Sequence, residues 1–170
     1  MKMNNISEKA IIGENVQIGS FCVIEEDVII GDNTIIKNYV ELRKNTIIGE
    51  DCYIDSRVST SGNCKIGDRV TLRYDSIIAR GVEIGDDTYV CPRVMTNNLD
   101  SGKIQIGGAK IGAKCFIGTN SVLQHGISIV NNTTIGSLSF VNKDIMDSGI
   151  YFGNPAKKYH KEKELYESKS

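Results

Sequence analysis

The sequence has no tryptophan, only two prolines and only two histidines among its 170 residues. Its 20 Lys and Arg nearly balance 21 Asp and Glu, which gives a net charge of −1 at pH 7. The absence of a basic excess argues against a nucleic-acid-binding protein. No run approaches the roughly 20 apolar residues of a membrane span, and residues 1–10 lack the apolar core of a signal peptide. We therefore expect a cytoplasmic protein without a membrane span.

Metal ligands at suitable spacing are also scarce. The five cysteines include no C-x-x-C pair, and two histidines are too few for a zinc site of three imidazoles. We therefore expect no metal. Four of the cysteines share one phase of the repeat described below, and we expect them to be small core residues, namely Cys22, Cys52, Cys64 and Cys115.

A six-residue period dominates the chain from Ile12 to Thr96. Stepping by six, thirteen of the fifteen positions hold branched aliphatic residues and the other two hold threonine. The position four residues after each of them, up to Val94, is always small or β-branched. Helical faces recur every three or four residues, and β-branched residues at this density disfavour a helix. The period instead predicts a prism, in which each hexad forms one short strand and one corner.

Three hexads would complete a turn of 18 residues, and successive turns would stack roughly 4.8 Å apart, the spacing of paired strands. The period resumes at Ile111 and continues through Ile117, Leu123, Ile129, Ile135 and Val141. Counting hexads on both sides gives about seven coils. A repeat of this kind is specific for the fold and much less so for the function.

The period slips within "CPRVMTNNLDSGKIQIGG" (91–108). Thr96 and Ile111 lie fifteen positions apart, so the phase shifts by three and a loop must leave the prism between about residues 97 and 105. Such a loop can be mere decoration, but loops on rigid scaffolds often carry function. Its polar side chains suit the recognition of sugar hydroxyl or amino groups, and the candidates are Arg93, Asn97, Asn98 and Asp100.

The repeat resembles the hexapeptide-repeat, left-handed β-helix family over about residues 12–147. "IGSLSFVNKD" (135–144) and "GNPAK" (153–157) resemble the end of the acetyltransferases of that family. This resemblance implies an all-β, left-handed parallel β-helix over residues 1–154. It also implies a tail at 155–170, where we expect a short charged helix from about Lys157.

The same resemblance implies a homotrimer that uses acetyl-CoA. Coenzyme A would lie along a corner between adjacent subunits, and lysines suit its phosphates. By position in the family motifs, the candidate coenzyme A ligands are Thr119, Ser137, Asn142, Lys143, Lys157 and Lys158.

The loop departs from many relatives at one position that matters for chemistry. Where those relatives place a histidine as general base, this chain has Asn97, and an amide cannot accept a proton at neutral pH. Loss of a base costs a hydroxyl acceptor roughly 10²–10⁴-fold in rate, whereas a neutral amine can attack a thioester directly. His125, expected at an exposed corner near the coenzyme, is the alternative base.

We therefore predict acetyl transfer to the amine of a nucleotide-linked amino sugar, a step in surface polysaccharide synthesis. One alternative is O-acetylation of a sugar hydroxyl. A second alternative is a non-enzymatic β-helix scaffold. An ice-binding scaffold would need outward rows of threonine, and we expect Glu, Asp, Lys and Asn in the outward positions instead.

Overall fold

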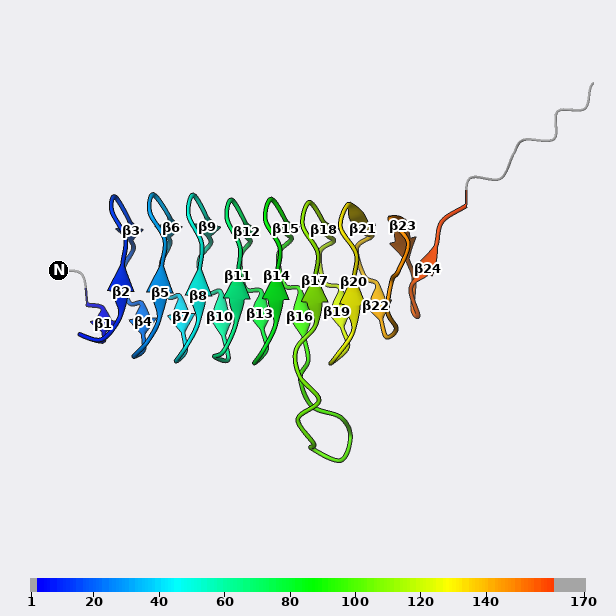
Figure 1. Ribbon diagram of the computed structural model, residues 1–170, viewed down its shortest axis with the longest axis horizontal. Helices are drawn as coiled ribbons and strands as arrows, with labels where there is room; N and C mark the ends of the chain where they lie inside the picture. Colours follow the sequence, from blue (N-terminus) through cyan, green and yellow to red (C-terminus); the bar gives the residue numbers. More distant parts are fainter. Residues whose placement is uncertain (1–2, 161–170) are drawn as a thin grey trace, which may run out of the picture.

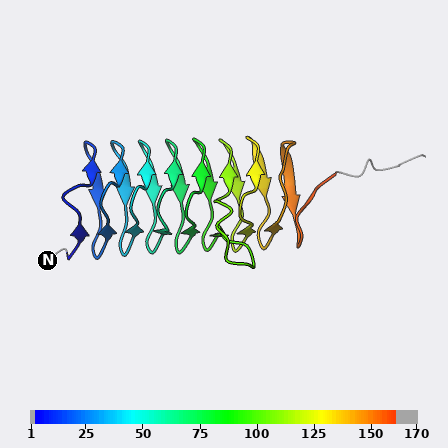
Figure 2. The same cartoon turned by 60° about the horizontal axis from the view of Figure 1, so that its bottom comes forward.

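The computed structural model describes residues 3–160, which form a parallel β-helix with three sheets as its faces (Figures 1 and 2). Within these residues there is no helix, and therefore none that could cross a membrane. The predicted all-β parallel β-helix is confirmed. It has about eight turns rather than seven, because its first and last strands lie outside the regular hexads that were counted.

Each turn contributes one short strand to each sheet. In spatial order, sheet 1 contains β1 (Asn5–Ile6), β4 (Val23–Ile24), β7 (Glu41–Leu42), β10 (Ser59–Thr60), β13 (Ile77–Ile78), β16 (Met95–Thr96), β19 (Val122–Leu123) and β22 (Phe140–Val141). Sheet 2 contains β2 (Ile11–Ile12), β5 (Ile29–Ile30), β8 (Ile47–Ile48), β11 (Lys65–Ile66), β14 (Glu83–Ile84), β17 (Lys110–Ile111) and β20 (Ser128–Ile129).

Sheet 3 contains β3 (Gln17–Ile18), β6 (Ile35–Ile36), β9 (Tyr53–Ile54), β12 (Thr71–Leu72), β15 (Tyr89–Val90), β18 (Phe116–Ile117), β21 (Thr133–Ile135), β23 (Gly149–Phe152) and β24 (Lys157–Lys158). We call the turns from sheet 1 to sheet 2 corner I, those from sheet 2 to sheet 3 corner II, and those from sheet 3 to sheet 1 corner III.

The interior is a set of stacked aliphatic columns. In register, Ile36 pairs with Ile18 on one side and Ile54 on the other, each 18 positions away. Ile36 and Ile54 are at most 1% exposed, and burial of such a side chain contributes about 1.5–3 kcal/mol. Ile12, expected in the same columns, is 36% exposed because it lies in the first turn, where no earlier turn covers it. In the first turn, therefore, an aliphatic residue on the inward phase of the repeat is not fully buried.

The small residues of the repeat tie successive turns together. The Cys22 thiol donates to the Lys37 carbonyl (3.0 Å), Thr34 Oγ1 donates to the Gly49 carbonyl (3.0 Å), and the Cys52 thiol donates to Gly67 (3.1 Å). Each donor thus reaches an acceptor fifteen positions further on, in the next turn. The four predicted core cysteines are buried and free of disulfides. Burial raises the pKa of the Cys52 thiol to about 11, so it stays protonated at neutral pH.

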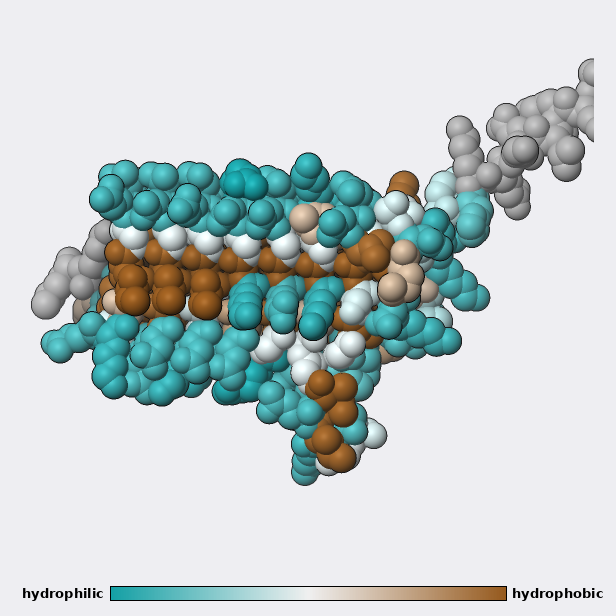
Figure 3. Space-filling view, in the orientation of Figure 1, coloured by the Kyte–Doolittle hydropathy of each residue, from teal (hydrophilic) through white to brown (hydrophobic). Residues whose placement is uncertain are grey.

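The outer face of sheet 2 differs from our expectation of charged and amide side chains. Its first three strands expose Ile11 (61%), Ile29 (36%) and Ile47 (39%). Figure 3 shows the resulting apolar patch over β2, β5 and β8. Lys65, Glu83 and Lys110 occupy the same column further on, so the outward residues change character along the prism.

The segment between β16 and β17 spans residues 97–109 and contains the predicted loop at about 97–105. Ile84 pairs with Ile111, 27 positions away, whereas regular pairs lie 18 apart, so the loop adds nine residues to its turn. A phase shift gives the number of added residues only up to a multiple of six. The nine added residues therefore appear in the sequence as a shift of three. The loop leaves corner I and protrudes from the prism (Figures 1 and 2).

The chain closes the third sheet with a reversal. β23 pairs parallel with β21, and β24 then pairs antiparallel with β23. The short helix predicted from about Lys157 is wrong for residues 157–160, where Lys157 and Lys158 form β24. The remaining part of that prediction, residues 161–170, lies outside the described residues.

Candidate functional site

The protruding loop is a small hairpin braced by its own backbone. Leu99 and Gln105 form an antiparallel bridge, and the Asn98 carbonyl accepts hydrogen bonds from the backbone N–H groups of Ile106 (3.0 Å) and Gly107 (3.3 Å). Asp100 Oδ1 accepts the Ile104 N–H at 2.9 Å. Part of the Asp100 carboxylate therefore holds the tip of the hairpin, which leaves its other oxygen for a ligand.

The two polar residues at the root of the loop lie on opposite edges of sheet 1. Arg93 is exposed at corner III, where its backbone N–H donates to the Tyr74 carbonyl (3.0 Å). Asn97 is half-buried at corner I, and its backbone N–H donates to the Leu123 carbonyl (3.0 Å). The width of β16 separates them, so the two side chains border one face rather than form one cluster.

His125 lies one turn beyond the loop, on the same corner. The next residue, Gly126, donates its N–H to the Gly107 carbonyl at the base of the loop (3.0 Å). A Cβ added at Gly126 would come within 2.9 Å of Ile106, so the hairpin packs directly over this corner. His125 is half-buried, and its Nδ1 is covered without a hydrogen-bond partner among residues 3–160. The sequence predicts an exposed histidine at this corner; the structure has it half-buried, beside a glycine that contacts the loop.

Four of the predicted coenzyme A ligands come together at the C-terminal end of the solenoid. Asn142, Lys143, Lys157 and Lys158 line one cavity of about 410 Å³. Lys158 Nζ lies 6.0 Å from the ring centroid of Tyr151, which lines the same cavity. Three lysines in the lining of one cavity suit a ligand with several phosphate oxygens.

The acidic neighbour in this cavity, Asp144, is partly engaged elsewhere. Its Oδ1 accepts the Ser128 N–H at 2.8 Å, and it thereby links corner I of the last turn to sheet 2. The cavity therefore holds three lysines against one carboxylate that already has a hydrogen-bond donor. Its net charge favours an anion.

The other two predicted ligands, Thr119 and Ser137, lie on corner III in adjacent turns. The Leu138 N–H donates to the Thr119 carbonyl at 2.9 Å, which fixes the spacing of the two turns. Sheet 1 separates these residues from Asn142 and Lys143 on corner I. The predicted site residues thus line both edges of the C-terminal half of sheet 1.

The face between these edges was missed in the sequence. The outward residues Met95, Val122 and Phe140 follow one another in register from the loop toward the lysine cavity. Met95 is 36% exposed and the other two are half-buried. The outward positions of the same sheet in β7 and β10 are Glu41 and Ser59, so the change from polar to apolar was the available signal.

Comparison with known protein families identifies the repeat. The family described as bacterial transferase hexapeptide (six repeats) matches residues 9–44 and 45–80. The hexapeptide repeat of succinyl-transferase matches residues 108–140, after the loop. The matches cover the turns on both sides of the protruding loop.

Individual relatives are acyltransferases. A chloramphenicol acetyltransferase of Agrobacterium fabrum is 33% identical over 64 residues, which is 38% of this chain and 31% of that protein. The chain thus spans about a third of the length of this curated relative.

Solved structures match over most of the chain. The UDP-N-acetylglucosamine O-acyltransferase of Moraxella catarrhalis shares a TM-score of 0.68 at 25% identity, covering 92% of this chain and 72% of that one. AntD, described as an N-acyltransferase from Bacillus cereus in complex with dTDP and coenzyme A, shares a TM-score of 0.53 at 18% identity, covering 92% and 81%. The second likeness shows the fold alone. On the repeat, the fold and the family matches together, the chain belongs to the hexapeptide-repeat family of transferases.

Proposed function

We propose that the protein is an acyl-CoA-dependent acyltransferase that transfers acetyl to the amino group of a nucleotide-linked sugar. The observation that carries this proposal is the lysine-lined cavity of about 410 Å³ at the end of a face that begins at the polar loop. The names of the curated relative and of the Moraxella structure, both acyltransferases, support the reaction class. The Moraxella name also supports a nucleotide-linked sugar as acceptor.

Coenzyme A would extend along the C-terminal half of sheet 1. Lys143, Lys157 and Lys158 would bind its phosphates in the cavity, and Asn142 would add an amide donor. The apolar column of Val122 and Phe140 would pack against the pantetheine chain, and Thr119 and Ser137 would border it at corner III. The thioester would then reach the turn of Met95, next to the root of the loop.

The reaction at the loop needs little acid–base help when the acceptor is a neutral amine. The amine nitrogen attacks the thioester carbonyl carbon, the new C–N bond forms, and the C–S bond breaks. The proton lost from nitrogen ends on the departing thiolate, which gives free coenzyme A. Asn97 would orient the acceptor through its amide, with Asn98, Asp100 and Arg93 hydrogen-bonding the sugar and its phosphates; such positioning accelerates the step without a base.

A hydroxyl acceptor is the second candidate, and two observations favour it. His125 Nδ1 is covered and without a partner within residues 3–160, beside the loop, and an imidazole can take the proton of an attacking hydroxyl. The Moraxella relative is also named an O-acyltransferase. The two candidates differ in whether the imidazole is needed for the chemical step.

A further part of this proposal is that the protein acts as a homotrimer. The hairpin exposes three aliphatic side chains, Leu99 (46%), Ile104 (62%) and Ile106 (50%), on an arm that protrudes from corner I. Figure 3 shows these apolar residues as a patch on the loop. Exposed apolar area of this kind is typical of an interface. Three copies around one axis would cover the arms and place each loop against a neighbouring prism.

The test is an acceptor screen that follows release of free thiol from acetyl-CoA. Nucleotide-linked amino sugars and the matching hydroxyl sugars are compared with wild-type protein, Asn97→Ala and His125→Ala. We expect turnover with an amino sugar, a loss of about tenfold or less for each variant, and a trimer by light scattering. Activity on hydroxyl sugars alone, with a loss of about 10²–10⁴ in His125→Ala, would replace the amine by the hydroxyl.

Two results would contradict the proposal itself. One is the absence of any thermal stabilisation by millimolar acetyl-CoA, because a ligand that binds only the folded state must stabilise it. The other is a loss above about 10⁴ in Asn97→Ala, which would assign this amide a role in bond making and not in orientation.

A further inference from the structure

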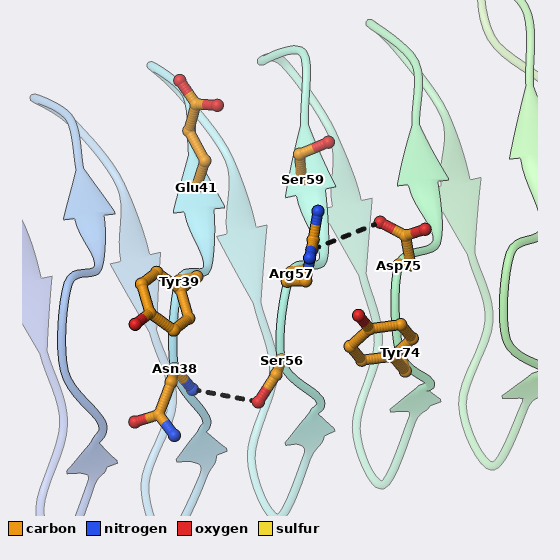
Figure 4. A pocket seen from close by; sticks show the side chains of 8 residues that line it. All are labelled: Asn38, Tyr39, Glu41, Ser56, Arg57, Ser59, Tyr74 and Asp75. Atoms are coloured by element: carbon orange, nitrogen blue, oxygen red, sulfur yellow. Dashed lines mark hydrogen bonds and ion pairs between the residues drawn. The ribbon is translucent and has the colours of Figure 1, made fainter.

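A second cavity lies on corner III, in the turns before the loop. It has a volume of about 690 Å³, larger than the lysine cavity, and eight residues line it: Asn38, Tyr39, Glu41, Ser56, Arg57, Ser59, Tyr74 and Asp75. Figure 4 shows Arg57 between the two tyrosines, which come from turns on either side of it. None of these residues takes part in the site described above.

Three of the eight residues that line this cavity, Tyr39, Arg57 and Asp75, have a positive φ. Each corner has a residue with positive φ, a conformation that suits Gly, Asn and Asp and disfavours bulky side chains. At corner I these residues include Asp27, Asn45, Asn63 and Gly81. At corner III, Tyr39 (φ 58°) and Arg57 (φ 64°) adopt the same conformation. Other bulky corner residues adopt it too, namely Phe21, Arg69, Arg93, Lys114 and Leu138, so this conformation alone does not single out the cavity.

The two tyrosines present ring faces to the cavity. Phe21 stacks on Tyr39 with centroids 5.2 Å apart and planes 6° from parallel, and Arg57 follows Tyr39 on the next turn (Figure 4). The guanidinium of Arg57 lies 5.9 Å from the ring centroid of Tyr74. Tyr39 is 59% exposed and Tyr74 is 36% exposed. Aromatic faces and a guanidinium plane in this arrangement suit a flat ring.

The rim of the cavity carries polar groups but little net charge. Arg57 Nε lies 3.8 Å from Asp75 Oδ1, and Arg43 pairs with Glu41 at 2.6 Å. Amide and hydroxyl groups of Asn38, Ser56 and Ser59 complete the rim. A neutral ring with donors and acceptors on its edge fits these groups better than a phosphate does. A phosphate is better matched by the next exposed residue along corner III, Arg93.

That next residue is Arg93, one turn further toward the loop. Its backbone N–H donates to the carbonyl of Tyr74, which lines the cavity. The order along corner III is therefore aromatic cavity, exposed arginine and then, across β16, the root of the loop at Asn97. This order matches a base, a diphosphate and a sugar in an extended chain.

We propose that the Tyr39–Arg57–Tyr74 cavity binds the nucleobase of a nucleoside diphosphate, which carries the acceptor sugar to the loop. The inference rests on the proposed function for the identity of the acceptor, and it adds where the nucleotide binds. The base packs on the exposed surfaces of the Tyr39 and Tyr74 rings and of the Arg57 guanidinium, the diphosphate lies beside Arg93, and the sugar reaches Asn97.

The test uses nucleotides without a sugar and without acetyl-CoA. UDP, dTDP and GDP are titrated by calorimetry into the full-length protein and into Tyr39→Ala, Tyr74→Ala and Arg57→Gln. We expect at least one nucleotide to bind, and each variant to bind it about tenfold more weakly, the effect of removing one stacking partner. Arg69→Gln and Tyr159→Ala are the matched controls, because Arg69 holds the same positive-φ position at corner II and Tyr159 is exposed outside the cavity. Both should bind as the wild type does.

The outcomes separate this inference from the proposed function. Acetyl transfer with nucleotide affinity unchanged in all three cavity variants would overturn the inference and leave the transferase intact. Tyrosine-dependent nucleotide binding without any acetyl-CoA binding would support the cavity and overturn the transferase. Binding of a free amino sugar, but of no nucleotide, would also overturn the assignment of the base. Melting temperatures within a few degrees of the wild type show that the variants are folded.

Discussion

The turns before and after the protruding loop have the same interior and different surfaces. Ile54 in β9 and Ile117 in β18 are both fully buried, and Cys52 and Cys115 occupy equivalent small positions with equivalent hydrogen bonds to the next turn. Outside, the early turns carry isoleucines on sheet 2 and the aromatic cavity on corner III. The later turns carry the hairpin, the apolar column on sheet 1 and the lysine cavity.

This difference shows that the inward positions of the solenoid serve packing, whereas its outward positions are available for binding. The interior must repeat, because each turn packs only against its neighbours and any wrong side chain breaks the stack. The outward positions are free of that constraint. Departures from the repeat, such as the nine added residues of the loop, are therefore the places to look for chemistry.

The largest expected effect comes from removing the loop while keeping the prism. Deletion of residues 98–106 leaves four residues between β16 and β17, as at the regular corners, and restores the 18-residue spacing. We expect acetyl transfer to fall by more than about 10³-fold, because acceptor positioning is lost, with an unchanged far-ultraviolet circular dichroism spectrum. Thiol release assays measure the loss. Full activity in a folded deletion variant would show that the loop is decoration.

Substitutions of buried residues should lower the free energy of unfolding by similar amounts before and after the loop. Ile54→Ala and Ile117→Ala each leave a cavity in the aliphatic columns and should lower the free energy of unfolding by about 2–5 kcal/mol. Urea denaturation at one protein concentration measures both. Ile29→Ala is the control, because this isoleucine is 36% exposed on sheet 2 and its loss should cost less. A large difference between the two buried variants would contradict an equivalent interior.

The lysine cavity should distinguish the later turns from the early ones in coenzyme affinity. Lys143→Ala and Lys157→Ala each remove one ammonium group from the cavity and should weaken coenzyme A binding about tenfold. Lys65→Ala, on the outer face of sheet 2, is the matched control and should leave the affinity unchanged. Isothermal titration gives the three values. Equal affinities in all variants would place the coenzyme elsewhere.

The smallest expected effect is in the ion pairs of the early turns. Hydrogen bonds from Lys44 and Lys9 lower the pKa of the Glu26 carboxyl from its ordinary 4.5 to about 2. Because the folded-state pKa is lowered, the stabilisation is full above pH 4.5 and is lost as the pH falls through about 2. These groups are exposed, so solvent screens the effect. Glu26→Gln should lower the melting temperature slightly at pH 7 and not in 1 M salt, whereas the exposed Glu8→Gln should not. An effect that persists in 1 M salt would contradict the ion-pair origin.

Much of the fold could be predicted from the sequence, because one aliphatic and one small residue per hexad leave few alternatives to a prism. The turn count was one short, since the first turn and the strand Gly149–Phe152 lack that pattern. The phase shift indicated where the loop leaves the prism, but it carries no information about whole hexads. The motif predicts the C-terminal lysines as coenzyme A ligands, and this stays a prediction; the reversal into β24 brings Lys157 to the same cavity as Lys143.

The surfaces were harder to predict. The aromatic cavity is built from residues 17 or 18 positions apart, such as Tyr39, Arg57 and Tyr74, whose side chains share no chemical type. A hydrophobic period does not identify such a group, because the group forms only where side chains from successive turns meet at the same corner. The burial of His125 Nδ1 and the contact of the hairpin with the adjacent Gly126 are features of packing, which a count of residues cannot show.

Hydrogen exchange of the backbone with and without acetyl-CoA tests the division of the surface most directly. The account predicts slower exchange on binding in the C-terminal half alone, at residues 119–122, 137–143 and 149–158 and at the root of the loop. Residues 11–66 should exchange at the same rate in both samples. Protection confined to those early turns, or no protection anywhere at saturating acetyl-CoA, would contradict it.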